Sequence, residues 1–206
     1  MRDTRRHALL ITLLGGGLAV PAIYFGIQLL CGLILDPDYS FIRQAASELG
    51  SDRARHPAIF NAAIMVQGVC TLAATAGYVG ALHLLGARLA SIIAVCVCLL
   101  MNAFQTFWAG FFPMPDPRHG GHPVFIVFML ALPVVLTLVH WRSAPRFARI
   151  YFIANLVLLA AMVPLMSGAA SIDTSAMRGL LQRLFTLTVF PPIAVGSWLT
   201  IGRLRF

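Results

Sequence analysis

The sequence contains no lysine and few charged residues of any kind. Of its 206 residues, 11% are charged and 59% are hydrophobic, whereas about 25% of an ordinary soluble domain is charged. This composition excludes a disordered chain and argues against a water-soluble globular protein. The four cysteines all lie within apolar stretches, so they do not indicate the disulfide framework of a small secreted domain: Cys31, Cys70, Cys96 and Cys98.

Six long segments of the chain carry no charged residue. A helix needs about 20 mostly apolar residues to cross the hydrocarbon layer of a membrane, and each segment supplies roughly that number. Backbone groups inside a bilayer find no water, so such a segment must close its own hydrogen bonds as a helix. We therefore predict an all-α polytopic membrane protein, one domain over 1–206 built as a six-transmembrane-helix bundle, with spans at about 8–35, 58–86, 89–112, 122–141, 148–169 and 182–202. The first stretch is too long for a cleaved signal peptide.

The distribution of arginine predicts how the bundle is oriented. Six spans put both termini on one side, and that side carries nine arginines against six on the other. The positive-inside rule then places both termini in the cytoplasm, and we expect the protein in the plasma (inner) membrane. The arginines are scattered over several loops and form no continuous stripe. They therefore indicate membrane lipids with anionic headgroups as partners, and not nucleic acid.

The first outer loop runs from Asp36 to about Ile59 and is predicted to contain a short amphipathic helix. Apolar residues recur at helical spacing over 39–49, and we expect Ser40 as the N-cap and Gly50 as the residue that ends the helix. Such a helix would lie at the outer surface of the membrane or fold back over the bundle.

Ser47 and Glu48 stand at the C-terminal end of this predicted helix. A carboxylate there opposes the helix dipole, so Glu48 requires a cationic partner unless it is simply solvated. The candidate partners are Arg53, Arg55 and Arg183.

The loop after the third span combines several prolines and glycines with the pattern D-x2-H-x2-H, formed by Asp116, His119 and His122. These side-chain types can bind zinc or another transition metal as a cofactor, with Glu48 available as a fourth ligand. The spacing matches no specific zinc signature, so two other interpretations stay open. The histidines can cap the fourth span or pair with Asp116, or His119 or His122 can act as a general acid or base.

Several polar side chains fall in the outer halves of the predicted spans. Polar groups within a bilayer usually face the interior of the bundle or a water-filled cavity. We therefore predict an outward-facing polar vestibule, with the simple alternative that the amides only bond neighbouring helices. The candidate ligand-binding residues are Gln28, Asn61, Gln67, Asn102, Gln105 and Arg183.

The chain resembles DUF998, a family of small prokaryotic membrane proteins of unassigned function. The resemblance covers about 8–200 and rests on Ser47-Glu-Leu-Gly50 after the first span, Phe60-Asn61 at the start of the second, and Phe112-Pro113 followed by Asp116 and a histidine. It implies a six-helix membrane protein whose distinctive residues cluster at one end. It implies no activity.

Three functions are compatible with these features. The first is binding or passage of a lipid or other small amphiphile through the outer vestibule. The second is an intramembrane lipid hydrolase or transferase. In its metal-free form Glu48 or His119 is the base, Ser47 is the nucleophile and Asp116 is the orienting acid. In its metal-assisted form Asp116, His119 and His122 hold a metal that activates water. The third is an accessory or scaffold subunit. The first is favoured because amides gather beneath two irregular polar loops.

Overall fold

The structure is a computed structural model that describes residues 2–170 and 172–205, with side chains from Thr4 onward. Within this part of the chain there are six long helices and no strand, and all six helices are long and apolar enough to cross a membrane. The predicted six-helix membrane fold is confirmed. The helices are α1 (Arg2–Leu29), α2 (Pro57–Leu84), α3 (Leu89–Phe111), α4 (Pro123–His140), α5 (Arg146–Met166) and α6 (Arg178–Leu204).

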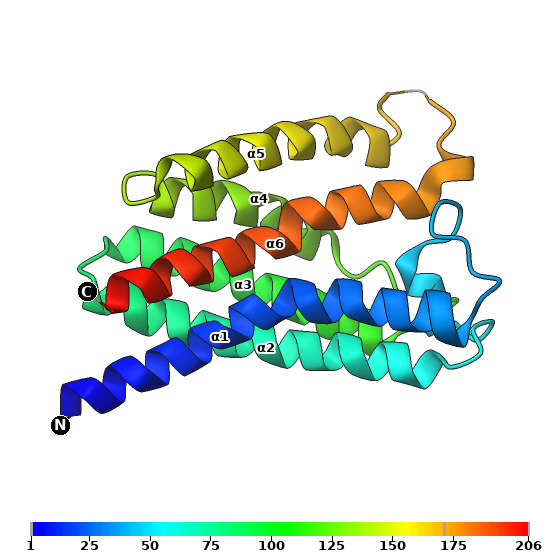
Figure 1. The fold of residues 1–206 in the computed structure, drawn as a ribbon. Helices are drawn as coiled ribbons and strands as arrows, with labels where there is room; N and C mark the ends of the chain where they lie inside the picture. Colours follow the sequence, from blue (N-terminus) through cyan, green and yellow to red (C-terminus); the bar gives the residue numbers. More distant parts are fainter. Residues whose placement is uncertain (1, 171, 206) are drawn as a thin grey trace.

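The two ends of the bundle differ in the length of their loops. The start of α1 and the end of α6 lie at one end, together with the short connections 85–88 and 141–145 (Figure 1). We call this the terminal end. The opposite end, the loop end, carries three longer connections: 36–56, 112–122 and the described residues between α5 and α6, 167–170 and 172–177. Both termini therefore lie at the same end of the bundle, as the prediction of six spans requires.

Helix α6 lies in the middle of the bundle and α5 at its edge. Of the most apolar 18-residue window of each helix, 67% is buried in α6 but only 22% in α5. Helix α6 packs against α1, α2, α4 and α5, while α1–α2, α2–α3, α3–α4 and α4–α5 form the other contacts between the long helices. The other described helices therefore leave most of the surface of α5 uncovered.

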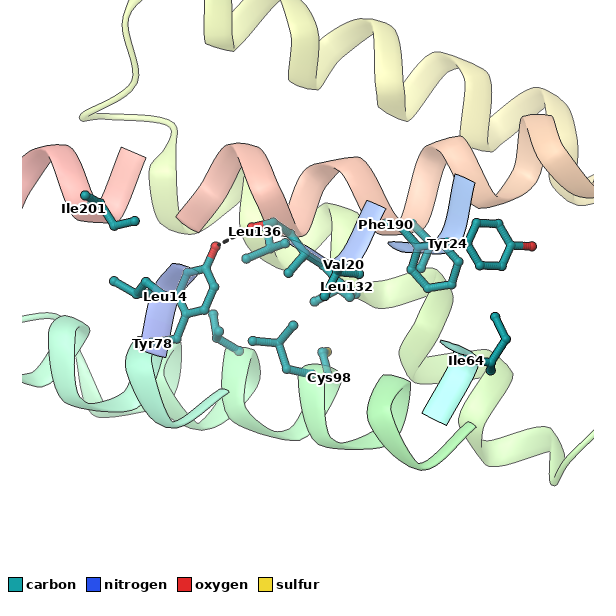
Figure 2. Close-up of a cluster of buried hydrophobic side chains, with 14 of the residues drawn as sticks. Leu14, Val20, Tyr24, Ile64, Tyr78, Cys98, Leu132, Leu136, Phe190 and Ile201 are labelled. Carbon is teal, nitrogen blue, oxygen red and sulfur yellow. Dashed lines mark hydrogen bonds between the residues drawn. The ribbon is translucent and has the colours of Figure 1, made fainter. Parts of the chain in front are cut away.

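The core is filled by large apolar side chains from α1, α2, α3, α4 and α6. Figure 2 shows Leu14, Val20 and Leu136 packed in this cluster, with the fully buried Tyr78 beside them. The Tyr78 hydroxyl donates a hydrogen bond to the Ile193 carbonyl at 3.2 Å. A buried hydroxyl needs a partner in hydrocarbon, and this bond ties α2 to α6.

Helices α1 and α2 approach each other closely because small residues line their contact. A Cβ atom on Gly77 of α2 would lie 2.8 Å from the Leu14 backbone nitrogen, and one on Gly16 of α1 would lie 2.6 Å from the Cys70 carbonyl oxygen. Membrane helices lack a hydrophobic driving force toward each other, so close packing of small residues is a main source of their association. Gly16 in the first span therefore packs directly against α2.

Asn155 of α5 donates a hydrogen bond to a backbone carbonyl of α6 that has no helical partner. Pro191 has no N–H, so the Leu187 carbonyl one turn earlier loses its normal helical partner. The Asn155 side-chain amide donates to that carbonyl at 3.3 Å. This bond gives the peripheral helix α5 a specific polar attachment to the central helix.

The helix in the first outer loop is shorter than predicted. The structure has a 3-10 helix, η2, over Ala46–Gly50, which ends at Gly50 as expected and buries Ala46 and Leu49. Ser40 caps only one isolated turn, in which its hydroxyl accepts from the Arg43 N–H at 3.3 Å. The prediction of one continuous helix over 39–49 is therefore wrong, because contacts with α6 hold residues 41–46 in a non-helical path.

Candidate functional site

A cavity of about 620 Å³ lies inside the loop end of the bundle. This volume falls within the range of about 300–1,000 Å³ that is typical of small-molecule sites. All six long helices, η2 and the 112–122 loop contribute to its wall. Its polar and apolar lining includes Tyr24, Ala46, Ser47, Phe60, Asn61, Gln67, Asn102, Gln105, Thr106, His119, Ile126, Met129, Val163, Gln182, Thr186 and Phe190.

Three side-chain amides in this lining have atoms without a hydrogen-bond partner. Both polar atoms of Gln67, the carbonyl oxygen of Asn102 and that of Gln105 are buried and unbonded among the described residues. Gln67 is 0% exposed and Asn102 is 1% exposed. An unsatisfied polar group costs roughly 1–3 kcal/mol in a protein interior. These amides therefore offer several donors and acceptors to a molecule in the cavity.

The amides lie well below the loops. Gln67 stands ten residues after the start of α2, and Asn102 stands nine residues before the end of α3. At 1.5 Å per residue, both are on the order of 15 Å from the helix ends. A ligand that reaches them would lie within the hydrocarbon layer, with its polar group at the deep end of the cavity.

Two loops close over the cavity. Ala46 and Ser47 of η2 and His119 and Gly120 of the 112–122 loop form part of its lining, and the Ser47 hydroxyl contacts the Met114 sulfur at 3.3 Å. The first loop thus rests on the second.

Gly121 allows the 112–122 loop to approach Gln105. Its φ of +71° belongs to the left-handed region, and a Cβ atom there would meet the Gln105 side chain. Glycine suits both requirements, because it adopts positive φ without strain and has no side chain to displace the amide. The backbone of the 112–122 loop therefore packs directly against the side-chain amide of Gln105.

The structure separates the six predicted ligand-binding residues into two groups. Asn61, Gln67, Asn102 and Gln105 line the same cavity, but Gln28 and Arg183 are not among its lining residues. Gln28 is buried and donates to the Tyr24 carbonyl of its own helix at 3.0 Å. The amides of α2 and α3 therefore form the site, and the amide of α1 does not.

Arg183 holds the first outer loop in place. One of its guanidinium nitrogens, Nη1, lies 2.7 Å from the Phe41 carbonyl oxygen and 3.1 Å from that of Gln44, and Nη2 donates to the Tyr39 hydroxyl at 2.5 Å. The guanidinium also lies over the Phe41 ring at 4.7 Å. Burial raises the pKa of Tyr39, so its hydroxyl stays protonated and bonds the loop carbonyls. Arg183 thereby fixes the roof of the cavity.

Glu48 has a structural role that differs from the predicted one. It is the third residue of η2, and its carboxylate accepts a hydrogen bond from the Ala45 N–H at 2.8 Å. A carboxylate near a helix N-terminus is favourable. Its cationic neighbour is Arg178, at 3.5 Å, and not Arg53, Arg55 or Arg183. The prediction is wrong because the helix is shorter than expected: the sequence places Glu48 at the C-terminal end of a helix over 39–49, but it lies in the first turn of η2. Glu48 does not line the cavity.

Asp116 is occupied by Arg118. Both carboxylate oxygens accept hydrogen bonds from the Arg118 guanidinium, at 2.9 and 2.7 Å. These bonds, followed by one from the Arg118 backbone N–H, lower the pKa of Asp116 to about 2. The aspartate therefore remains ionised and paired with its neighbour, and among the described residues its carboxylate forms no hydrogen bond with the His119 ring.

The two histidines of the pattern lie in different environments. The Nδ1 atom of His122 accepts from the Val124 N–H at 3.2 Å and caps α4, which is one of the interpretations left open by the sequence. The Nδ1 atom of His119 lies 2.7 Å from the Phe112 carbonyl oxygen. A carbonyl only accepts, so Nδ1 carries the proton of this hydrogen bond, and in that tautomer Nε2 is an acceptor. Of the two histidines, only His119 lines the cavity.

The predicted metal site is not assembled in the described part of the chain. No group of three or more His, Cys, Asp or Glu side chains there is arranged to hold a metal ion. Asp116 bonds Arg118, and His122 directs one ring nitrogen to its own helix. We therefore derive no chemistry from a zinc ion bound by Asp116, His119 and His122.

Comparison with known proteins identifies the family. A family model described as a protein of unknown function, DUF998, matches residues 14–199. The chain belongs to the DUF998 family. No curated protein and no solved structure matches it.

The segments that carried the resemblance to DUF998 meet at the loop end of this DUF998 protein. Ser47, Phe60 and Asn61 all line the cavity. The Asn61 side-chain amide donates to the Gly50 carbonyl at 2.9 Å, so the segment after the first span is bonded to the start of the second. The first two of these segments therefore contribute to the wall of the cavity, while Phe112, Pro113 and Asp116 of the third are not among its lining residues.

Sequence reasoning missed Gln182 and the threonines of the lining in this DUF998 protein. Gln182 lies in the outer half of the last span, and the rule that selected the other amides could have selected it. Its side-chain oxygen accepts from the Ala46 N–H at 2.5 Å. Thr106 bonds the carbonyl of Asn102 in its own helix, and such local bonding leaves no distinct signal in the sequence.

Proposed function

We propose that this DUF998 protein binds a neutral, hydrogen-bonding amphiphile in the cavity at its loop end. The observation that carries the proposal is the set of unpartnered amide atoms on Gln67, Asn102 and Gln105 in a cavity of about 620 Å³. A ligand hydroxyl or amide would satisfy these atoms in a region where bulk water is absent.

The rest of the lining defines the chemical class of the ligand. None of the lining residues is Asp, Glu, Lys or Arg, so nothing with a fixed charge balances a charged headgroup. Apolar side chains such as Ile126, Met129, Val163 and Phe190 form much of the wall and favour a hydrocarbon body. A long-chain alcohol or a diacylglycerol has this combination of a neutral hydroxyl and an apolar chain.

Substitution of one cavity amide tests the proposal. We expect Gln67→Leu to weaken the binding of a long-chain alcohol about tenfold or more, since one or two hydrogen bonds are lost. The stability of the empty protein is expected to stay equal or rise, because an unsatisfied buried amide is removed. Native mass spectrometry of the detergent-purified protein measures binding, and thermal unfolding measures stability.

Gln28→Leu is the matched control, because Gln28 is also buried in the loop-end half of the bundle but does not line the cavity. It should leave alcohol binding unchanged. A fatty acid anion of the same chain length should bind more weakly than the alcohol. Equal loss of binding in the Gln28 and Gln67 variants, or no binding of any neutral amphiphile, would contradict the proposal.

His119 favours a second candidate function, hydrolysis or acyl transfer on a lipid ester. Its ring is held by the Phe112 carbonyl with Nε2 as the acceptor, and both His119 and Ser47 line the cavity. A neutral imidazole can take a proton from water or from a serine hydroxyl that attacks an ester carbonyl. If this function operates, His119→Gln should abolish release of fatty acid from a diacylglycerol and retain binding. Wild-type protein that binds the lipid and releases no fatty acid would remove this candidate.

The orientation of the bundle is part of the proposal. The described arginines at the terminal end include Arg5, Arg6, Arg88, Arg142 and Arg203, so by the positive-inside rule we expect this end to face the cytoplasm and the cavity to open outward. A membrane-impermeant maleimide should label Arg53→Cys in intact cells and label Arg142→Cys only after lysis. The reverse pattern would show that the cavity faces the cytoplasm.

A further inference from the structure

A second hollow lies at the terminal end of the bundle, along the end of α6 and beside Pro145, the residue that precedes α5. It is a groove of about 440 Å³ whose lining includes Pro145, Trp198, Gly202, Arg203 and Arg205. It shares no residue with the cavity at the loop end. The groove therefore has to be explained separately from the proposed amphiphile site.

One side of α6 builds the groove. Trp198, Gly202 and Arg205 are spaced by four and three residues, which places them on the same face of the helix. A Cβ atom on Gly202 would meet nothing within 4 Å, so the absent side chain leaves open space between the tryptophan and the arginine. Gly202 is one of the residues that line the groove.

The aromatic side chains place the groove at the surface of the membrane. Trp198 is 49% exposed and packs against the exposed Phe147, with ring centroids 5.7 Å apart. Exposed tryptophan near the end of a span is typical of the headgroup level of a bilayer. Arg203 and Arg205 follow five and seven residues later, roughly 8–10 Å farther along the helix, where lipid phosphates lie.

The charge of the terminal end is strongly positive. Arg203 and Arg205 are both exposed, and neither forms an ion pair with a described side chain. Every carboxylate whose side chain the structure describes belongs to a loop at the opposite end: Asp36, Asp38, Glu48, Asp52, Asp116 and Asp173. An anionic group in the groove would therefore meet two guanidinium groups and no described carboxylate.

We propose that this groove binds one anionic phospholipid, with the phosphate on Arg203 and Arg205 and an acyl chain along Trp198. Guanidinium groups bind phosphate oxygens through paired hydrogen bonds, and basic hollows between membrane helices bind acidic headgroups. The tryptophan and the open space above Gly202 favour a lipid over a free phosphate ion, because they provide contact area for a hydrocarbon chain.

Native mass spectrometry with phosphatidylglycerol and phosphatidylcholine tests this inference. We expect one phosphatidylglycerol to be retained per protein in preference to phosphatidylcholine. The double variant Arg203→Gln/Arg205→Gln should weaken its binding about 30-fold, since each basic residue near the surface contributes on the order of a factor of five. Gly202→Leu should also weaken it while keeping both charges, because the new side chain fills the groove.

Arg5→Gln/Arg6→Gln is the matched control, since it removes the same charge from exposed residues at the same end. It should change binding less than about threefold. An equal effect of the two double variants would show general surface attraction and overturn the site. Equal retention of phosphatidylcholine, or full displacement of the lipid by millimolar inorganic phosphate, would overturn the proposed lipid. None of these results depends on whether an alcohol binds beside Gln67.

Discussion

Replacing Arg183 with methionine is expected to lower the free energy of unfolding by about 3 kcal/mol and to release the first outer loop. The guanidinium bonds the Phe41 and Gln44 carbonyls and the Tyr39 hydroxyl, and a hydrogen bond to a charged group contributes about 1.5–3 kcal/mol. Methionine keeps much of the apolar stem but bonds none of these oxygens. Hydrogen exchange of the amides in 40–46 should accelerate, while exchange in the centre of α2 should not.

The matched control is Arg53→Met, in the same loop. Arg53 is exposed, and its guanidinium forms no ion pair among the described side chains. Its replacement should change stability by less than about 0.5 kcal/mol. If both variants protected 40–46 as well as the wild-type protein does, the loop would be held by something other than Arg183.

Gly77→Ala is expected to destabilise the bundle by about 2–3 kcal/mol, although alanine favours a helix more than glycine does. The new Cβ atom would lie 2.8 Å from the Leu14 backbone nitrogen and 3.1 Å from the Leu13 carbonyl carbon. A backbone cannot rotate away as a side chain does, so α1 and α2 must separate along their contact. Thermal unfolding followed by size-exclusion chromatography should give a clearly lower midpoint.

Gly80→Ala provides a control three residues farther along the same helix. Its added Cβ atom would meet only the side chain of Leu10, the nearest atom being Cδ2 at 2.5 Å, and a leucine end can change rotamer. This variant should match or exceed the wild-type midpoint, because alanine is the better helix former. An equal loss in the Gly77 and Gly80 variants would contradict the backbone contact.

The membrane fold follows from the sequence because a physical requirement acts on each segment separately. An apolar segment in hydrocarbon must be helical whatever its neighbours are. The six long segments without charged residues therefore predicted the positions of the six helices. The same local reasoning placed Asn61, Gln67, Asn102 and Gln105 in one half of their spans. Short connections then brought α2 and α3 side by side, and the structure joins these four residues in one cavity.

The errors come from contacts between residues far apart in the chain. The segment 39–49 has helical periodicity, but Arg183 and the Leu180 N–H of α6 bond its carbonyls and prevent a continuous helix. That change moved Glu48 from a predicted C-terminus to the N-terminal turn of η2. Gln28 is not among the residues that line the cavity, and its side-chain amide bonds the Tyr24 carbonyl of its own helix.

The central claim is that a ligand occupies the cavity and satisfies the amides at its deep end. An experimentally determined structure of the protein, extracted from its native membrane and reconstituted in a lipid nanodisc, tests this claim most directly. We expect elongated density in the cavity, ending within hydrogen-bond distance of the Gln67 and Asn102 side chains. A cavity that has collapsed so that these amides bond each other, or one that holds only scattered water, would contradict the account.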